Sequence, residues 1–257
     1  MSKTTIRNGR LCNQIIRNLA VSILAEKNNL HINYANYHII NDKLGIKLFI
    51  GKLKYDNTRI IKEYNYKKIL DRKIDYNINL NNEYFQSYGI SDIIFTHLNT
   101  SKIKNNIIEK NRFKNRYNNN NDLFIHIRLG DVKKYSPGFT YFVSCIKSIP
   151  HDNLYIGSDS INNILIRKIK YLFPYLIIID KNEYETIQFG STCKNIVLSH
   201  GSFSACIGYL SFFSNVYYSF LNPVNNWCPK ELFLNKGWTP IKHIRAKYLH
   251  SNLKKKS

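Results

Sequence analysis

The chain has 257 residues, of which 44% are hydrophobic and 14% aromatic, so it can bury a sizeable core in one compact protein with two lobes. No apolar run reaches the roughly 18 residues that span a bilayer, and the first residues lack the apolar segment of a secretory signal. We therefore expect a cytoplasmic protein with no membrane span, in the host cytoplasm if the source is an AT-rich virus or parasite.

The charge balance has two interpretations, because 38 Lys+Arg against 17 Asp+Glu give a net charge of +21. A basic surface would suit nucleic acid or another anionic partner. However, Lys is spread along the chain together with Asn and Ile, which is the composition that AT-rich codons produce. We expect no nucleic-acid partner, and a basic nucleic-acid-binding protein stays the alternative.

The cysteines predict neither a disulfide framework nor a zinc site. There are five, an odd number, and none has a CxxC or Cys-x-x-His spacing. We expect them to be reduced and mostly buried, and we expect no metal.

The first half of the chain gives a clear pattern only at its start. A Gly-containing segment, residues 7–14, precedes apolar residues at helical spacing between Ile15 and Leu24, and residues 30–35 predict a strand. Residues 36–104 are ambiguous, and the Asn-rich residues 105–121 predict a linker. We therefore expect a first lobe at residues 1–121 and a second lobe with a basic tail at residues 122–257.

The second half alternates short apolar strands with amphipathic helices. This alternation predicts an α/β fold, with a parallel sheet covered by helices on both faces. Ligands bind to such sheets beyond the carboxyl ends of the strands. The predicted strands are 123–129, 153–158, 175–180, 195–199 and 215–220, and the predicted helices are 139–149, 160–173, 183–191 and 203–213.

The first candidate strand end is DLFIHIRLGD, residues 122–131. His126 and Arg128 share one face of the strand because alternate residues do. A guanidinium at the end of a strand offers donors that match phosphate oxygens. The alternative is an ion pair between Arg128 and Asp131 that only caps the strand.

Two further strand ends carry polar residues. Asp159 follows the strand at 153–158, where it could cap a helix or accept hydrogen bonds from a ribose or base. Ser202 and Ser204 are predicted N-caps of the helix after the strand at 195–199, and Gly201 would let a ligand approach the backbone. Helix-terminal N–H groups there would form an anion site, and a plain helix cap is the alternative.

Five segments in order resemble motifs of the inverting fucosyltransferase superfamily. HIRLGD is similar to the HxRRGD motif that α-1,2-, α-1,6- and protein O-fucosyltransferases share, and the other segments are most similar to the α-1,2-fucosyltransferase family, glycosyltransferase family 11. Only about 36–121 lacks a match. The segments are NGRLCNQIIRNLA (8–20), HIRLGD (126–131), YIGSDS (155–160), LSHGSFSACIGYLS (198–211) and residues 215–241.

The resemblance implies a GT-B-like fold of two Rossmann-like lobes with a cleft between them. Residues 1–121 would be the acceptor-side lobe, and residues 122–257 would be the lobe that binds the nucleotide sugar. It also implies metal-independent transfer of fucose, with inversion, from GDP-fucose to a hydroxyl of a glycan or glycoprotein. Arg128 would hold the β-phosphate, and His126 and Asp159 would contact the guanosine. The segment Ser202, Phe203 and Ser204 would bind phosphate together with neighbouring N–H groups.

The resemblance also implies residues around the reacting sugar. Gly9, Arg10 and Asn13 would border it, and the predicted catalytic residues are Arg128, Asp131 and Asn13. The general base stays open, with Asp131 close to Arg128 and three unranked acidic residues in the unmatched segment. Those three are Asp42, Glu63 and Glu83.

Two positions depart from the family pattern. Leu129 stands where a second Arg is usual, and Cys12 stands where Gly is usual. The alternatives are therefore a related transferase that uses another nucleotide sugar, or a degenerate transferase kept as a carbohydrate-binding module.

Overall fold

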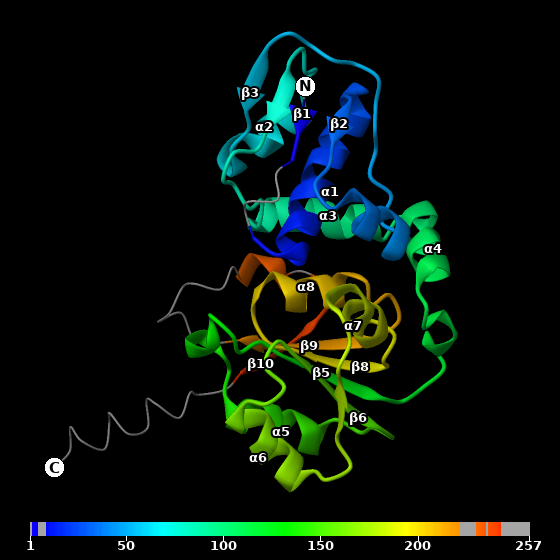
Figure 1. The fold of residues 1–257 in the computed structure, drawn as a ribbon, viewed down its shortest axis with the longest axis vertical. Coiled ribbons are helices and arrows are strands. Elements are labelled where there is room, and N and C mark those ends of the chain that lie inside the picture. The colour runs from blue at the N-terminus through cyan, green and yellow to red at the C-terminus, as the bar shows by residue number, and fades with distance from the viewer. Residues whose placement is uncertain (1, 5–8, 221–229, 235, 243–257) are drawn as a thin grey trace, which may run out of the picture. The chain divides into compact units, whose positions relative to one another are not determined.

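Every strand pairing in the computed structural model is parallel within the part of the chain that it describes, namely residues 2–4, 9–220, 230–234 and 236–242. The pairings form two sheets, each in its own unit. Unit 1 comprises Met1–Asn111 and Pro229–Lys236, and unit 2 comprises Arg112–Cys228 and Gly237–Ser257 (Figure 1). The α/β fold with parallel sheets that the alternation predicts is thus confirmed.

The sheet of unit 2 has the strand order β10-β9-β8-β5-β6-β7. From β5 the chain proceeds outward to β7, returns to β8 on the other side of β5, and then proceeds outward again. This order is compatible with a Rossmann-like fold, and its switch point lies between β5 and β8. The strands are β5 (Leu123–Ile127), β6 (Leu154–Ser158), β7 (Ile177–Ile179), β8 (Asn195–Leu198), β9 (Asn215–Phe220) and β10 (Thr239–Lys242).

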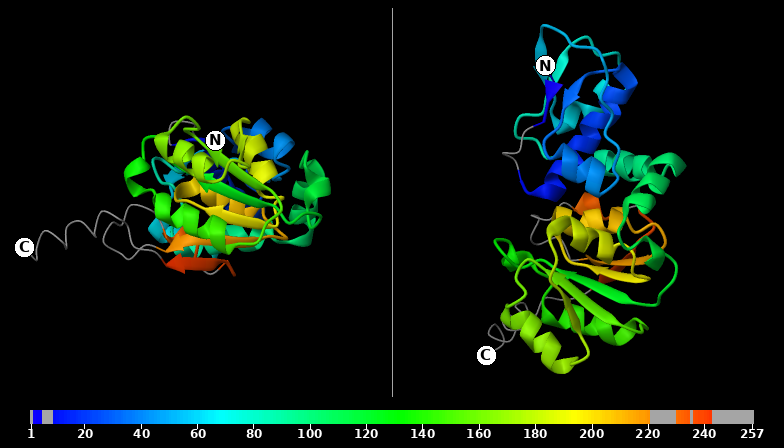
Figure 2. Two further views of the ribbon diagram at one scale, coloured as in Figure 1. Left: turned by 90° about the horizontal axis from the view of Figure 1, so that it is seen from below. Right: turned by 45° about the vertical axis from the view of Figure 1, so that its right-hand side comes forward.

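Helices cover both faces of this sheet. Because βαβ crossovers are right-handed, a reversal of direction at the switch point moves the helices to the opposite face. Accordingly α5 (Phe139–Ser148) and α6 (Ile164–Leu172) lie on one face, and α7 (Glu183–Gly190) and α8 (Gly201–Tyr209) lie on the other (Figure 1). Figure 2 shows the same separation from a second direction.

Strand β5 is buried on both faces, and its two sets of alternate residues pack against different helices. Ile125 and Ile127 belong to the core cluster that contains Tyr141 and Phe142 of α5. His126 instead faces α8. The strand therefore directs one polar side chain toward α8 without interrupting the core below.

The face toward α7 is packed tightly around Phe124. A Cβ atom on Gly157 would lie 2.7 Å from the Phe124 ring, and one on Gly190 would lie 2.6 Å from it. Both distances are shorter than real Cβ contacts. Glycine is therefore required at these positions by the close approach of an aromatic ring.

Unit 1 has a four-stranded sheet in the order β2-β1-β4-β3. Its strands are short, and a π-helical turn (Ile39–Lys43) and a 3-10 turn (Glu63–Asn65) lie among its loops. The elements are β1 (Ser2–Lys3), β2 (Ile32–Asn33), β3 (Thr58–Ile60), β4 (Asn77–Asn79), α1 (Leu11–Asn28), α2 (Tyr66–Leu70), α3 (Tyr88–Leu98) and α4 (Ser101–Lys110).

Helix α1 fixes the loops of unit 1 through buried polar side chains. Asn18 Nδ2 donates to the Ala35 carbonyl at 2.7 Å, and Ser22 Oγ accepts from the Phe49 N–H at 2.8 Å. Burial of these polar groups is tolerated because they are hydrogen-bonded. Irregular loops are thereby joined to a helix that is buried on most sides.

A late segment of the chain returns to unit 1. The side chain of Lys236 is fully buried and forms an ion pair with Asp92 on α3. Ser91 Oγ donates to the Glu231 carbonyl at 2.7 Å. Burial lowers the pKa of Lys236, and its hydrogen bond with Asp92 opposes that effect.

Most predicted elements of the second half match the observed ones within a few residues. Two predictions about helices and strands are wrong. Residues 105–110 are the end of α4 rather than linker, and β10 follows the strand at 215–220, which was expected to be the last. The unit boundary lies at Asn111–Arg112, whereas the predicted division was at residue 121. Segment Pro229–Lys236 belongs to unit 1, although it was predicted to lie in the second lobe.

The cysteines in the described part of the chain, Cys12, Cys145, Cys193 and Cys206, are buried, as predicted. Cys228 lies outside the described residues. Among the described helices, none combines the length and apolarity that crossing a bilayer requires.

The packing around Phe124 leads to a stability prediction. Gly190→Ala should lower the free energy of unfolding by about 1–3 kcal/mol, because the new methyl group overlaps the ring. The same change in a Phe124→Leu background should cost less, since the smaller side chain leaves room. Urea denaturation of the four proteins of this cycle measures the coupling, and equal costs in both backgrounds would contradict the packing argument.

Candidate functional site

The switch point brings together residues from two strand ends. Strands β5 and β8 are paired, with Ile125 opposite Val197. Beyond this pairing His126 Nδ1 lies 2.6 Å from Ser204 Oγ, and the His126 ring stacks on Phe203 with centroids 4.8 Å apart. His126 thus meets two predicted site residues that are distant from it in the sequence, Phe203 and Ser204, at the carboxyl edge of the sheet.

His126 is a neutral imidazole at ordinary pH. It is 2% exposed, and burial lowers its pKa to about 3, with His200 and Arg128 adding to the effect through their charges. A neutral ring can donate at one nitrogen and accept at the other. The side chain therefore acts as a hydrogen-bonding group and a flat stacking surface rather than as a cation.

The first turn of α8 begins at a glycine. Gly201 has φ of +84°, a left-handed conformation that favours glycine, and a Cβ atom there would meet nothing within 4 Å. The N-cap residue is His200, whose Nδ1 lies 3.2 Å from Ser199 Oγ. The start of α8 therefore faces open space, and the positive end of the helix dipole lies there.

The prediction that Ser202 or Ser204 caps this helix is wrong. Both lie inside α8, because the left-handed turn at Gly201 allows the helix to start earlier. Ser204 is fully buried and bonds His126 instead. Ser202 is half-buried in the first turn.

Arg128 is held by two carboxylates. Its guanidinium forms ion pairs with Asp159 and Asp131, and Asp159 Oδ1 also accepts from the Leu129 N–H at 2.8 Å. Asp159 can approach this closely because residue 130 is a glycine. A Cβ atom at Gly130 would lie only 2.4 Å from the other carboxylate oxygen of Asp159. The ion pair between Arg128 and Asp131, predicted as the alternative, is present.

Asp159 does not cap a helix. The N-cap of α6 is Asn163, whose Oδ1 accepts from the Leu165 N–H at 2.9 Å. Asp159 fixes both the guanidinium of Arg128 and the turn that follows β5. Its carboxylate is therefore a positioning group for Arg128.

The two carboxylates differ in how easily they can leave Arg128. The Asp131 side chain is 61% exposed, whereas that of Asp159 is 21% exposed and that of Arg128 is 15% exposed. An exposed ion pair contributes little stability, so Asp131 can turn into water at small cost. An anionic group that binds Arg128 would take the place of Asp131.

Leu129 has a structural role. It is only 3% exposed and belongs to the core cluster between the sheet and α5 and α6. Leu129 packs there with Ile125 and Ile127, whereas His126 faces α8 on the other side of the sheet. An arginine at this position would have to be buried in the core.

The predicted sugar-side residues lie in unit 1. Gly9 has φ of +87°, and a Cβ there would overlap the Asn13 side chain. Asn13 Oδ1 accepts from Gln86 Nε2 at 2.8 Å, and Gln14 Nε2 donates to the Gly9 carbonyl at 3.3 Å. Gly9 and Arg10 are exposed at the start of α1.

The structure separates the acidic candidates for the general base. Glu63 accepts from the Ser87 N–H at 2.6 Å, and Glu83 accepts from the Glu63 N–H at 3.2 Å. Asp42 instead lies 2.7 Å from His38 Nδ1 on a surface turn, and its pKa is lowered chiefly by a hydrogen bond from Asn41. Glu63 is thus hydrogen-bonded to the residue that follows Gln86, and Gln86 is the partner of Asn13.

Sequence reasoning missed two residues of these groups. Gln86 lies in the segment without a readable pattern, so no signal marked it. His200 was visible at the end of a strand, and its ring packs edge-on to Tyr135 at 6.4 Å. Within the described residues, no group of three or more His, Cys, Asp or Glu side chains could hold a metal ion.

No protein-family model, curated protein or solved structure matches the chain. The resemblance to fucosyltransferases therefore depends on the motifs themselves. The geometry of the residues is an independent guide to what the site can bind.

The buried imidazole leads to a pH prediction. In the unfolded chain His126 takes up a proton near pH 6.5, but in the folded protein only near pH 3, so stability is complete above about 6.5 and falls as the pH drops below it. Between about pH 6.5 and 5 the loss from this group should approach 2 kcal/mol. His126→Asn should reduce that loss, as measured by urea denaturation at both pH values.

His151→Asn is the matched control, since His151 lies in the same unit and its ring Nδ1 is 2.7 Å from the Ile149 carbonyl. His126→Asn should change the pH dependence of stability more than this control does. The same loss of stability in wild type and His126→Asn would contradict the burial argument.

Proposed function

We propose that the protein is a metal-independent, inverting glycosyltransferase that moves fucose from GDP-fucose to a hydroxyl of a glycan or glycoprotein. The observation that carries the proposal is the meeting of His126, Phe203 and Ser204 at the switch point, beside the start of α8. Nucleotides bind at this point in sheets of this strand order. These residues are also those to which the resemblance assigns the donor.

The donor fits the chemistry of this edge in two parts. The diphosphate would lie over the start of α8, where Gly201 leaves open space and the helix dipole favours an anion. Its β-phosphate would replace Asp131 on Arg128, while Asp159 keeps the guanidinium in position. His126 is only 2% exposed, so we propose that it orients Phe203 and Ser204 beside the nucleotide and does not itself contact the guanosine, the role that the resemblance implied.

The reaction would be a single displacement at the anomeric carbon. The acceptor oxygen forms a bond to that carbon as the bond to the diphosphate breaks, and GDP leaves with the bonding electrons. Arg128 and the N-terminus of α8 would stabilise the charge that develops on the leaving group. A base takes the acceptor proton, and Glu63 is the proposed base because it binds the N–H of Ser87, next in sequence to the Gln86 that bonds Asn13.

The proposal extends to the architecture. Each unit contains its own parallel sheet, and we propose that the units are the two lobes of a GT-B-like enzyme. The unit 1 residues Gly9, Arg10 and Asn13 would then border the sugar, and unit 2 would hold the nucleotide.

Loss of Arg128 should abolish most of the activity. Arg128→Ala should lower turnover a hundredfold or more, corresponding to about 3 kcal/mol of transition-state stabilisation, while the fold is retained. GDP release from GDP-fucose in the presence of acceptor glycans measures this. Arg112→Ala is the control, because Arg112 also forms an ion pair, with Glu185, on the surface of unit 2. Near-wild-type turnover of Arg128→Ala would refute the assignment.

A donor screen tests the substrate and the alternatives. Thermal stabilisation and nucleotide release are measured with several nucleotide sugars, and GDP-fucose is expected to be the sole responder. A response to another nucleotide sugar would show that this sugar, and not GDP-fucose, is the donor. Binding of a nucleotide sugar without release of its nucleotide would indicate a carbohydrate-binding module. Binding of nucleic acid that weakens steeply with salt would favour the nucleic-acid alternative instead.

The two carboxylates on Arg128 should have opposite effects on GDP binding. Asp131→Asn removes a competitor of the phosphate and should strengthen binding by about fivefold, the equivalent of about 1 kcal/mol. Asp159→Asn removes the group that positions the guanidinium and should weaken it. Calorimetry with GDP measures both, and weaker binding by Asp131→Asn would show that Asp131 also positions Arg128.

A further inference from the structure

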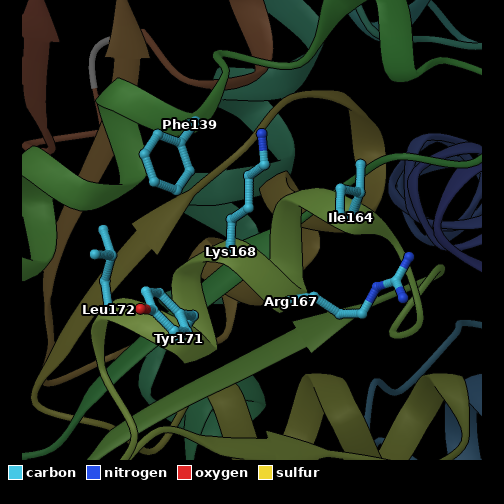
Figure 3. A pocket seen from close by; sticks show the side chains of 6 residues that line it. All are labelled: Phe139, Ile164, Arg167, Lys168, Tyr171 and Leu172. Atoms are coloured by element: carbon cyan, nitrogen blue, oxygen red, sulfur yellow. The ribbon is translucent and has the colours of Figure 1, made fainter.

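Helix α6 exposes apolar side chains on the face that does not contact the sheet. Ile164 is 55% exposed, Tyr171 84% and Leu172 48%, and Phe139 at the start of α5 is 36% exposed. With Arg167 and Lys168 they line a groove of about 510 Å³ whose wall is almost entirely carbon (Figure 3). Solvent-facing helix surfaces are ordinarily polar, so this face has the character of an interaction surface.

The charge on this face is all of one sign. Residues 160–179 contain no Asp or Glu, and Arg167, Lys168 and Lys170 are the cations of α6. The side of the helix that faces the core carries Ile166 and Ile169, which are fully buried. The exposed apolar residues are therefore not needed for packing within unit 2, and a partner for this face must be both apolar and negatively charged.

We propose that this face of α6, together with Phe139, docks onto an anionic membrane surface. Short basic amphipathic segments bind in the interface, with apolar side chains inserted shallowly and Lys and Arg among the headgroups. Tyr171 suits that depth because its ring is apolar and its hydroxyl polar. The net charge of +21 draws the whole protein toward such a surface.

Other partners fit this face less well. A second copy of the chain would bring two strongly basic molecules together. A stable protein partner needs roughly 1,000 Å² of complementary surface, more than one face of a nine-residue helix supplies. A bilayer requires neither shape complementarity nor specific hydrogen bonds, so it matches a shallow carbon-lined groove.

Sedimentation with lipid vesicles tests the proposal. The full-length protein should bind phosphatidylcholine vesicles that contain phosphatidylglycerol and should not bind phosphatidylcholine alone. Ile164→Ser should weaken binding roughly tenfold through lost apolar insertion. Lys168→Glu changes the charge by two units and should weaken vesicle binding about fivefold for each unit. Lys47→Glu, a charge reversal at an exposed lysine of unit 1, is the matched control and should have a smaller effect.

A depth measurement separates docking by α6 from non-specific adsorption of a basic protein. Brominated lipids should quench the fluorescence of the new tryptophan in Tyr171→Trp beyond the wild-type background. They should not do so in Tyr64→Trp, where the replaced side chain is similarly exposed (82%). Equal losses for Lys168→Glu and Lys47→Glu with no effect of Ile164→Ser would refute the proposal. So would the absence of binding to both kinds of vesicle, which would leave an acidic protein as the partner of this face.

Discussion

The parallel pairing of β5 with β8 is the constraint on which the candidate site depends. The two strands are neighbours in the sheet but are separated in sequence by β6 and β7. Their carboxyl ends meet because the chain changes direction once, after β7. This reversal puts α8 on the face toward which His126 points, and the hydrogen bond between His126 and Ser204 joins the two strand ends. Burial of that pair fixes the imidazole as neutral and gives the start of α8 a defined orientation toward open space.

The turn after β5 shows how small and charged residues cooperate. Gly130 leaves the space that Asp159 occupies, and Asp159 holds a side chain and a backbone N–H of the same turn. Removing one partner of such a cluster would leave a poorly solvated charge, which costs more than the ion pair contributes. The position of Arg128 is therefore determined by the protein itself and not by a bound ligand.

The sequence predicts unit 2 well because its physics is simple. Strands buried on both faces are continuous apolar runs, and the helices between them have one apolar side, so periodicity reveals both. In unit 1 this signal is weak. Strands β1 and β2 have only two residues each, β3 is exposed throughout, and α1 uses buried Asn18 and Ser22 to hold loops. Hydrophobic patterns cannot identify elements whose stability depends on polar contacts.

The candidate site divides in the same way. That His126 and the Ser202–Ser204 segment meet at one edge follows from the rule that parallel strands end together. That Asp159 holds Arg128 does not, because the contact joins residues 31 apart through a turn whose shape depends on Gly130. The helix start was also misplaced, since the effect of a left-handed Gly201 on the first turn depends on the three-dimensional path of the loop.

The return of Pro229–Lys236 to unit 1 has a consequence for how the chain could be divided. Neither unit is encoded by one continuous stretch, because the polypeptide leaves unit 1, passes through most of unit 2, comes back, and then adds β10 to the edge of the second sheet. A protein shortened at residue 228 would lack the lysine that neutralises Asp92 and the buried Leu232 and Phe233, as well as the outermost strand. Neither unit could therefore be produced as one uninterrupted segment, and a stop codon after residue 228 would remove part of both.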